Sequence, residues 1–438
     1  MTLATPQQGS ITTPYQGYVY AYPHKTAYRP LRPEPSLADV WADEDRRALF
    51  LYLHVPFCEM RCGFCNLFTR TGAPEELTGA YLDALERQAA AVTDALGGDA
   101  AFATAAFGGG TPTYLTAPEL ERLCDVAARF ADLPAIPLGV ETSPATATTD
   151  RLTVLRDRGT TRVSIGVQSF LDDEARAAVR PQKRAEVEAA LDRIRAVGFP
   201  VLNIDLIYGI DGQTPATWLH SLDAALAWKP EELYLYPLYV RPLTGLGRRA
   251  RDWDDQRLEL YRIGRDHLIG HGYEQVSMRM FRLPGGAGGG TEYCCQTDGM
   301  IGLGCGARSY TSSLHYSFEY AVGASQVRGI IDDYVRERDF GTARVGFTLD
   351  DGERRRRHLL QSLLQAEGLD RAAYRARFGA DAAADFAADL RAFGERGWLD
   401  RDDDVIRLTP DGLAHSDAVG PALFSGGVRA LMAAYEAR

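Results

Sequence analysis

One short stretch near the start of the chain decides both the fold and the chemistry that we expect. Residues 52–65 read Tyr52-Leu53-His54-Val55-Pro56-Phe57-Cys58-Glu59-Met60-Arg61-Cys62-Gly63-Phe64-Cys65. The stretch begins as an apolar run with the length of a buried strand, and it ends in three cysteines with the spacing C-x3-C-x2-C. Three thiolates on one short loop can bind three irons of a [4Fe–4S] cluster and leave the fourth iron open.

Two other interpretations of this loop are three buried cysteines and a zinc site that lacks one ligand. Structural zinc sites usually close with four nitrogen or sulfur ligands, and no fourth Cys or His follows at such a spacing. His54 precedes the loop on the predicted strand, where we expect a hydrogen-bonded structural histidine. We therefore predict a cluster on Cys58, Cys62 and Cys65 and structural roles for Cys124, Cys294, Cys295 and Cys305.

Outward from this stretch, short apolar runs alternate with longer helical patterns. Each apolar run is followed by one helical pattern: 50–55 by 76–96, 103–107 by 117–130, 137–141 by 149–158, 162–167 by 171–197, 201–207 by 215–227, and 232–238 by 253–271. Such alternation implies parallel strands joined by right-handed crossovers. We predict an α/β fold, a partial (β/α)6 barrel, with a doubly wound open sheet as the alternative.

The chain divides into four predicted segments. They are an N-terminal arm (1–47), the partial barrel (48–272), a less periodic extension of the barrel (273–348) and a small helical, winged-helix-like domain (349–438). The arm is rich in Tyr and Pro, and we expect it to pack on the main domain, with a lid over a site as the alternative. In the last segment we expect a short strand at 405–408, and a solvated helix face at the four arginines 354–357.

Composition narrows the class of protein. With 438 residues, 45% hydrophobic and 24% charged, the chain is typical of a globular protein. No apolar run approaches the roughly 18 residues of a membrane helix and no signal-peptide pattern opens the chain, so we expect a cytoplasmic protein without a membrane partner. The net charge of −11 disfavours nucleic acid as a partner. Seven cysteines are too few for a disulfide scaffold.

The cysteine stretch resembles that of the radical S-adenosylmethionine (SAM) superfamily, specifically its HemN-like family of anaerobic coproporphyrinogen III dehydrogenases and relatives. Three more blocks are similar and occur in the same order: 108–113 (Gly-Gly-Gly-Thr-Pro-Thr), 163–170 (Val-Ser-Ile-Gly-Val-Gln-Ser-Phe) and 203–209 (Asn-Ile-Asp-Leu-Ile-Tyr-Gly). The tail also resembles the C-terminal domain of this family. The resemblance implies a radical SAM oxidoreductase with a [4Fe–4S] cluster, SAM, a small-molecule substrate and an electron donor such as flavodoxin or ferredoxin.

The resemblance also implies roles for single residues. The open iron of the cluster would bind the amino and carboxylate groups of SAM, and one electron would cleave SAM to methionine and a 5′-deoxyadenosyl radical. The residues implied to bind SAM are Gly109, Gly110 and Thr111 at its methionine part, Glu141 at its amino group or a ribose hydroxyl, Gln168 and Asp205 at ribose hydroxyls, Arg180 at its carboxylate, and Tyr52 and Phe64 packed against it.

These blocks all fall towards the C-terminal ends of the predicted strands. The cysteine loop follows the first strand, the glycine triplet follows the second, Glu141 ends the third, Gln168 ends the fourth, and Asp205 lies towards the end of the fifth. The C-terminal ends of parallel strands are where α/β barrels and open sheets place their sites. We therefore expect one site at this end of the sheet.

The chain departs from the family pattern at three places. Leu67 stands where the porphyrinogen dehydrogenases have a further cysteine, residues 291–296 do not match the haem-chaperone relatives, and Arg308 replaces an apolar residue near a second SAM. We predict a HemN-like enzyme that lacks this cysteine and modifies an organic, porphyrin-like substrate. The alternatives are a class C-type radical SAM methyltransferase that uses a second SAM, and a haem-binding chaperone without turnover.

Overall fold

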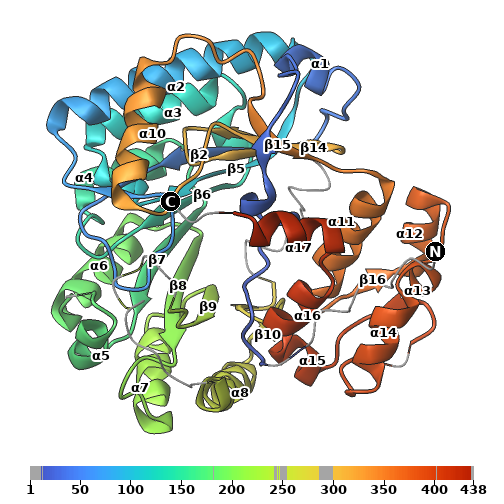
Figure 1. The fold of residues 1–438 in the computed structure, drawn as a ribbon. Coiled ribbons are helices and arrows are strands. Elements are labelled where there is room, and N and C mark those ends of the chain that lie inside the picture. The colour runs from blue at the N-terminus through green and yellow to red at the C-terminus, as the bar shows by residue number, and fades with distance from the viewer. Residues whose placement is uncertain are drawn as a thin grey trace. The chain divides into compact units, whose positions relative to one another are not determined.

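The computed structural model describes residues 11, 13–180, 182–240, 244, 246, 254–285, 299–400 and 402–435. The chain forms two compact units (Figure 1). One unit, the barrel unit, comprises residues 29–251 and 285–348. The other, the helical unit, combines residues 1–28 and 252–284 with residues 349–435.

The barrel unit is built on a mixed sheet whose strand order is β1-β15-β14-β13-β12-β2-β5-β6-β7-β8-β9. From β12 to β9 all neighbouring strands are parallel, whereas β1 and β13–β15 pair antiparallel. The strands are β1 (Arg29–Pro30), β2 (Leu49–Val55), β5 (Phe102–Gly109), β6 (Leu138–Thr142), β7 (Arg162–Gln168), β8 (Val201–Tyr208), β9 (Glu232–Pro237), β12 (Met300–Leu303), β13 (Arg308–Tyr310), β14 (Leu314–Ser317) and β15 (Val345–Thr348).

Helices cover one face of this sheet, and most of them lie in the connections between its parallel strands (Figure 1). They are α1 (Leu37–Trp41), α2 (Glu75–Leu96), α3 (Ala117–Ala128), α4 (Thr149–Asp157), α5 (Asp172–Ala177), α6 (Arg184–Val197), α7 (Pro215–Leu226) and α10 (Ala324–Arg336), with 3-10 turns η2 (Pro112–Tyr114) and η3 (Leu133–Ala135). Helix α2 forms here because its buried side chains recur at helical spacing: Tyr81, Leu82, Leu85, Ala89, Val92 and Leu96 face the core.

The predicted α/β fold with six strand–helix repeats is confirmed. Helix α3 begins where the pattern 117–130 predicts, behind a capping box in which the Thr116 N–H donates to the Glu119 carboxylate at 2.8 Å. One prediction is wrong in detail, because the single helical pattern over 171–197 is two helices, α5 and α6. In addition, β12 from the less periodic region adds a parallel strand beside β2.

The helical unit gathers three stretches of chain. Its elements are η1 (Lys25–Ala27), α8 (Asp254–Gly270), the hairpin β10 (Glu274–Gln275) with β11 (Met280–Arg282), α11 (Asp351–Leu363), α12 (Arg371–Phe378), α13 (Ala382–Asp385), α14 (Ala387–Gly394), α15 (Pro410–Ala414), α16 (Ser416–Ala422), α17 (Gly426–Ala433), and β16 (Leu369–Asp370) antiparallel to β17 (Val405–Ile406). The strand expected at 405–408 is therefore present at its first two residues.

Residues 21–28 of the arm contribute buried side chains to the helical unit. Tyr22 is only 1% exposed; it donates a hydrogen bond to Glu353 and its ring contacts Phe424. The prediction that residues 354–357 form a solvated helix face is wrong for Arg357, which is buried in α11. Among the described residues, no helix has both the length and the apolar character needed to cross a membrane.

Candidate functional site

The three predicted ligands lie on a loop that is closed at its base by two short strands. Strand β3 (Phe57–Cys58) pairs in parallel with β4 (Arg70–Thr71), so both ends of the loop are fixed. Cys62 is buried and the other two cysteines are half-buried. The Cys65 N–H donates to the Cys62 carbonyl at 3.1 Å, and all three thiols are outside any disulfide.

Side chains from other parts of the barrel unit reach the sulfur atoms. The Thr111 hydroxyl donates to Cys58 Sγ at 3.6 Å, and the Arg180 guanidinium donates to Cys62 Sγ at 3.0 Å. A Cβ atom on Gly110 would lie 3.0 Å from Cys58 Sγ and 2.6 Å from the Phe57 carbonyl oxygen. Only glycine allows the end of β5 to approach the cysteine loop this closely.

The chemistry of the loop fits an iron–sulfur cluster. Three soft sulfur donors are the ligands that iron–sulfur clusters take, and the hydroxyl and guanidinium donors suit thiolates. Burial raises the pKa of Cys58 to about 12, and it also raises the pKa of Cys65. The metal-free Cys58 thiol is therefore protonated near neutral pH, and metal binding must displace its proton.

Glu141 lies at the end of β6, next to the glycine triplet. Its carboxylate accepts a hydrogen bond from the Gly109 N–H at 3.1 Å, and a Cβ on Gly108 would lie 3.0 Å from both this carboxylate and the Tyr52 hydroxyl. By accessible surface Glu141 is an exposed residue of β6, although protein atoms lie densely around its carboxylate. Burial first, and the negative charge of Asp205 second, raise the pKa of Glu141 to about 7.

Asp205 on β8 is supported by a residue that the sequence analysis missed. The Asn203 side-chain amide donates to the Asp205 carboxylate at 2.7 Å. Burial raises the pKa of Asp205 to about 6, against the opposing effects of this hydrogen bond and of Arg162 and Arg180. Residues two apart on a strand share a face, which is the signal that could have singled out Asn203.

Gln168 and Arg180 come from β7 and from the segment after α5. Gln168 ends its strand with a φ of 69°, in the left-handed region, and is buried. Arg180 donates to the Gly166 carbonyl at 2.7 Å and to the Gln182 side chain at 2.8 Å, in addition to Cys62. The strand end and the cysteine loop are thus joined through one guanidinium group.

The remaining predicted residues lie on or beside the cysteine loop. Phe64 is a half-buried residue of the loop, and Tyr52 is half-buried on β2 with its hydroxyl 3.4 Å from His54 Nδ1. His54 is buried, and its Nε2 lies 3.1 Å from the Phe68 carbonyl oxygen, so the predicted structural histidine is confirmed. A Cβ on Gly109 or on Gly306 would overlap the imidazole ring.

The other cysteines divide into two groups. Cys124 and Cys305 are fully buried, as expected for structural residues. Cys294 and Cys295, and with them the stretch 291–296, lie outside the described residues.

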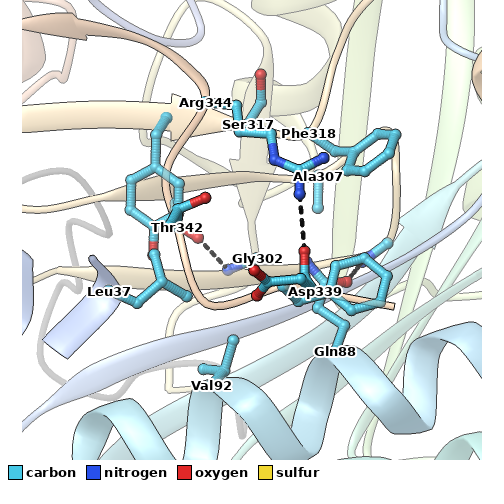
Figure 2. Close-up of a pocket in the computed structure, with 14 residues that line it drawn as sticks. Leu37, Gln88, Val92, Gly302, Ala307, Ser317, Phe318, Asp339, Thr342 and Arg344 are labelled. Carbon is cyan, nitrogen blue, oxygen red and sulfur yellow. Dashed lines mark hydrogen bonds between the residues drawn. The ribbon is translucent and has the colours of Figure 1, made fainter. Parts of the chain in front are cut away.

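Figure 2 shows a pocket on a different part of the barrel unit, lined in part by Gln88 and by Gly302 and Ala307 of the extension. None of the predicted site residues, all of which the structure describes, lines it. Its polar groups are already paired: Gln88 accepts hydrogen bonds from the Gly304 N–H and the Tyr334 hydroxyl, and Arg344 donates to the Asp339 carbonyl. We assign no ligand to this pocket.

Two segments of the chain match known protein families. Residues 52–225 match the model of the Radical SAM superfamily, and residues 349–415 match the HemN C-terminal domain. The heme chaperone HemW of Bacillus subtilis is 28% identical over 371 residues, which cover 82% of this chain and 95% of the relative. The oxygen-independent coproporphyrinogen III oxidase of Pseudomonas aeruginosa is 27% identical over 405 residues, covering 86% of this chain and 83% of the relative.

Among solved structures, coproporphyrinogen III oxidase (HemN) from Escherichia coli has the same fold. It aligns with a TM-score of 0.76 and 25% sequence identity, over 91% of this chain and 96% of that chain. Residues 52–225 are therefore a Radical SAM superfamily domain and residues 349–415 a HemN C-terminal domain, and the chain is similar to HemN in fold over most of its length.

Proposed function

We propose that this protein is a radical SAM enzyme that cleaves SAM reductively and thereby oxidises or modifies an organic substrate. One observation carries the proposal: the Arg180 guanidinium donates to Cys62 of the cysteine loop, and the Glu141 carboxylate accepts from the neighbouring glycine triplet, at the C-terminal ends of neighbouring parallel strands. Cys58, Cys62 and Cys65 would hold the [4Fe–4S] cluster. When bound, the cluster supplies one electron to SAM.

The chain's own residues would bind and orient SAM. A guanidinium has five N–H donors and Arg180 uses three of them on protein atoms, so two remain for the SAM carboxylate. The Glu141 carboxylate suits the ammonium group, and backbone without side chains at Gly109 and Gly110 allows close approach of the methionine part.

Further contacts would hold the nucleoside part of SAM. Gln168 and Asp205 suit ribose hydroxyls, and the amide of Asn203 fixes the carboxylate of Asp205 for this contact. Tyr52 and Phe64 would pack against the cofactor, and Thr111 would bind near its methionine part. A second SAM near the glycines of the extension is not needed to explain them, because a Cβ on Gly302, Gly304 or Gly306 would overlap the chain itself.

The substrate proposed here differs from that of the relatives named as coproporphyrinogen oxidases. Leu67 is 48% exposed on the cysteine loop, and its side chain can neither donate a proton nor act as a thiolate. We therefore assign an organic substrate other than coproporphyrinogen III, with porphyrin-like compounds as the first class to test. The protein would work in the cytoplasm with flavodoxin or ferredoxin as electron donor.

A haem-binding chaperone without turnover is the second candidate function. It is favoured by the relative named HemW, which this chain matches over 95% of that relative's length. In this case the cluster would be retained and haem would bind in stoichiometric amount.

One anaerobic experiment separates the two functions. The reconstituted protein is incubated with dithionite and excess SAM, and in parallel with haem, and 5′-deoxyadenosine and bound haem are quantified. Several equivalents of 5′-deoxyadenosine per protein, absent in the Cys62→Ala variant, support the enzyme. Stoichiometric haem uptake without any 5′-deoxyadenosine would favour the chaperone and contradict our proposal.

A further inference from the structure

We propose that Arg180 also sets the reduction potential of the cluster, by donating a hydrogen bond from a positive group to the ligand Cys62. The inference rests on the proposed function, because it requires the cluster on the three cysteines. Arg180 would then have two roles: it binds the carboxylate of SAM, and before SAM binds it sets the reduction potential of the cluster.

The guanidinium of Arg180 is held in place by the protein alone. It donates to Cys62 Sγ at 3.0 Å, to the Gly166 carbonyl oxygen at 2.7 Å and to Gln182 Oε1 at 2.8 Å. Gln182 is itself buried and donates to the Val167 carbonyl. Because β7 and Gln182 fix the group, its contact with Cys62 does not need a ligand to form.

The backbone next to Arg180 is hydrogen-bonded to the same cysteine loop. The carbonyl oxygens of Ala178 and Val179 both lie 3.2 Å from the Gly63 nitrogen and accept its N–H. Val179 has a φ of 53°, in the left-handed region, which is an outlier for a β-branched residue and marks strained backbone. The chain therefore maintains a strained residue at the point where it presents Arg180 to the neighbouring Cys62.

A charge of opposite sign lies on the other side of the loop. Glu59 follows Cys58 in the chain, and its Oε1 accepts a hydrogen bond from the Ser143 hydroxyl at 2.6 Å. Its Oε2 is buried, and within the described residues it has no hydrogen-bond partner. Cys62 thus has the cation of Arg180 beside it, and Cys58 has the anion of Glu59 beside it. Removing each charge in turn gives two variants that should shift the potential in opposite directions.

The sign of each effect follows from electrostatics. Reduction adds one electron, taken from a low-potential one-electron donor, and converts the cluster from the 2+ to the 1+ state without a change in bonds or protons. Net charge and hydrogen bonds to the sulfur atoms are established determinants of cluster potential. The cation of Arg180 stabilises the reduced state and raises the potential, whereas Glu59 lowers it.

The test is a potentiometric titration of the reconstituted protein without SAM, followed by the electron paramagnetic resonance signal of the reduced cluster. Arg180→Gln removes the charge but keeps a hydrogen-bond donor, and Glu59→Gln removes the opposite charge. We expect Arg180→Gln to lower the one-electron reduction equilibrium constant about tenfold, which corresponds to about 59 mV. We expect Glu59→Gln to shift the potential upwards. Iron and sulfide analysis confirms that each variant carries the cluster.

The outcomes separate this inference from the proposed function. An unchanged potential in Arg180→Gln with full iron content overturns the role of Arg180 and leaves the cluster intact. Shifts of the same sign in both variants also overturn it, since they would reflect disturbance of the loop. If Arg180→Gln does not load iron, Arg180→Lys is titrated instead and should show a smaller downward shift. A wild-type protein that binds no cluster would instead contradict the proposed function.

Discussion

At the scale of single residues, each cysteine of the loop has a different neighbour, but the loss of any one of them should have the same effect on the cluster. Cys58 meets Thr111, Cys62 meets Arg180, and Cys65 has Thr69 Oγ1 at 4.0 Å. Each thiolate would bind a different iron, so no neighbouring sulfur can replace a missing one.

We expect Ala in place of Cys58, Cys62 or Cys65 to remove the brown chromophore and leave substoichiometric iron. Cys124→Ala is the control, because Cys124 is buried in α3 and should leave the iron content unchanged. Iron and sulfide analysis with visible absorption after anaerobic reconstitution measures both. Full cluster retention in all three loop variants would contradict the ligand assignment.

Glu141 should make the affinity for SAM depend on pH. Its pKa is raised to about 7, so the carboxylate that would bind the SAM ammonium is mostly protonated at about pH 6 and mostly ionised at about pH 8. We expect the Kd of the oxidised, cluster-loaded protein for SAM to fall by up to about tenfold over this interval. Calorimetry should find this dependence flattened in Glu141→Gln, and an equally steep dependence in that variant would assign the titration to another group.

The raised pKa of Glu141 affects the stability of the fold in the direction opposite to its effect on SAM affinity: the free energy of unfolding falls as the pH rises. The folded protein holds a proton on Glu141 that the unfolded chain releases above its ordinary pKa of 4.5. This group's contribution to the free energy of unfolding is therefore fully present below about pH 4.5 and is lost as the pH rises through about 7.

The sequence predicts some of these residues and not others for a physical reason. Glu141 and Gln168 lie at the ends of strands and Asp205 lies in the second half of β8, so strand alternation predicts that they lie on the same side of the sheet. Asn203 shares a strand face with Asp205, so this contact has a signal in the sequence. The contact of Glu59 with Ser143 depends on the path of the loop, which periodicity does not encode, so it emerges only from the structure.

At the scale of elements, the segment between α5 and α6 is where the sequence pattern was least informative. The apolar spacing over 171–197 predicts one helix, because periodicity cannot show that the chain turns at Val179 to meet the cysteine loop. Tertiary contacts override the pattern here. By contrast, the start of α3 is encoded locally by its capping box and is predicted correctly.

This contact can be tested at Gly63. A Cβ on Gly63 would lie 2.6 Å from the Val179 Cβ and 2.9 Å from the Ala178 carbonyl oxygen, so the loop or the segment must move. We expect Gly63→Ala to lower the iron content after reconstitution and to destabilise the protein by about 1–3 kcal/mol. Gly79→Ala in α2 is the control, because its Cβ has no atom within 4 Å and should stabilise the helix by about 0.5–1 kcal/mol. Equal iron content in both variants would contradict the proposed contact.

At the scale of the whole molecule, the helical unit is assembled from three distant stretches that meet at one residue. The Asp417 carbonyl accepts hydrogen bonds from the Gln16 and Gly17 N–H groups, and its carboxylate pairs with Arg279 of the β10–β11 hairpin at 2.5 Å. The side chains of this ion pair are 1% and 6% exposed. The topology of the barrel follows from strand alternation, but this joining of the arm to the C-terminal helices has no periodic signal and could not be predicted.

We expect Asp417→Asn to lower the free energy of unfolding by about 3–5 kcal/mol, because it leaves a buried guanidinium without its counter-charge. Asp411→Asn is the matched control, since Asp411 pairs with Arg262 at a half-exposed position and should cost at most about 1 kcal/mol. Urea unfolding followed by circular dichroism measures both. Equal stability of the two variants would show that the buried pair does not hold the three stretches together.

The last prediction concerns the substrate of the whole enzyme. Leu67 occupies the position at which the porphyrinogen dehydrogenases are expected to have a cysteine, and a leucine can supply neither a proton nor a thiolate. If that cysteine is needed for propionate oxidation, the protein should cleave SAM but leave coproporphyrinogen III unchanged. The measurement is an anaerobic incubation with coproporphyrinogen III, dithionite and excess SAM, followed by chromatography of the tetrapyrroles and of 5′-deoxyadenosine. We expect slow accumulation of 5′-deoxyadenosine without protoporphyrinogen IX. Multiple-turnover formation of protoporphyrinogen IX would refute this assignment, because Leu67 would then be compatible with the oxidation that it is proposed to prevent.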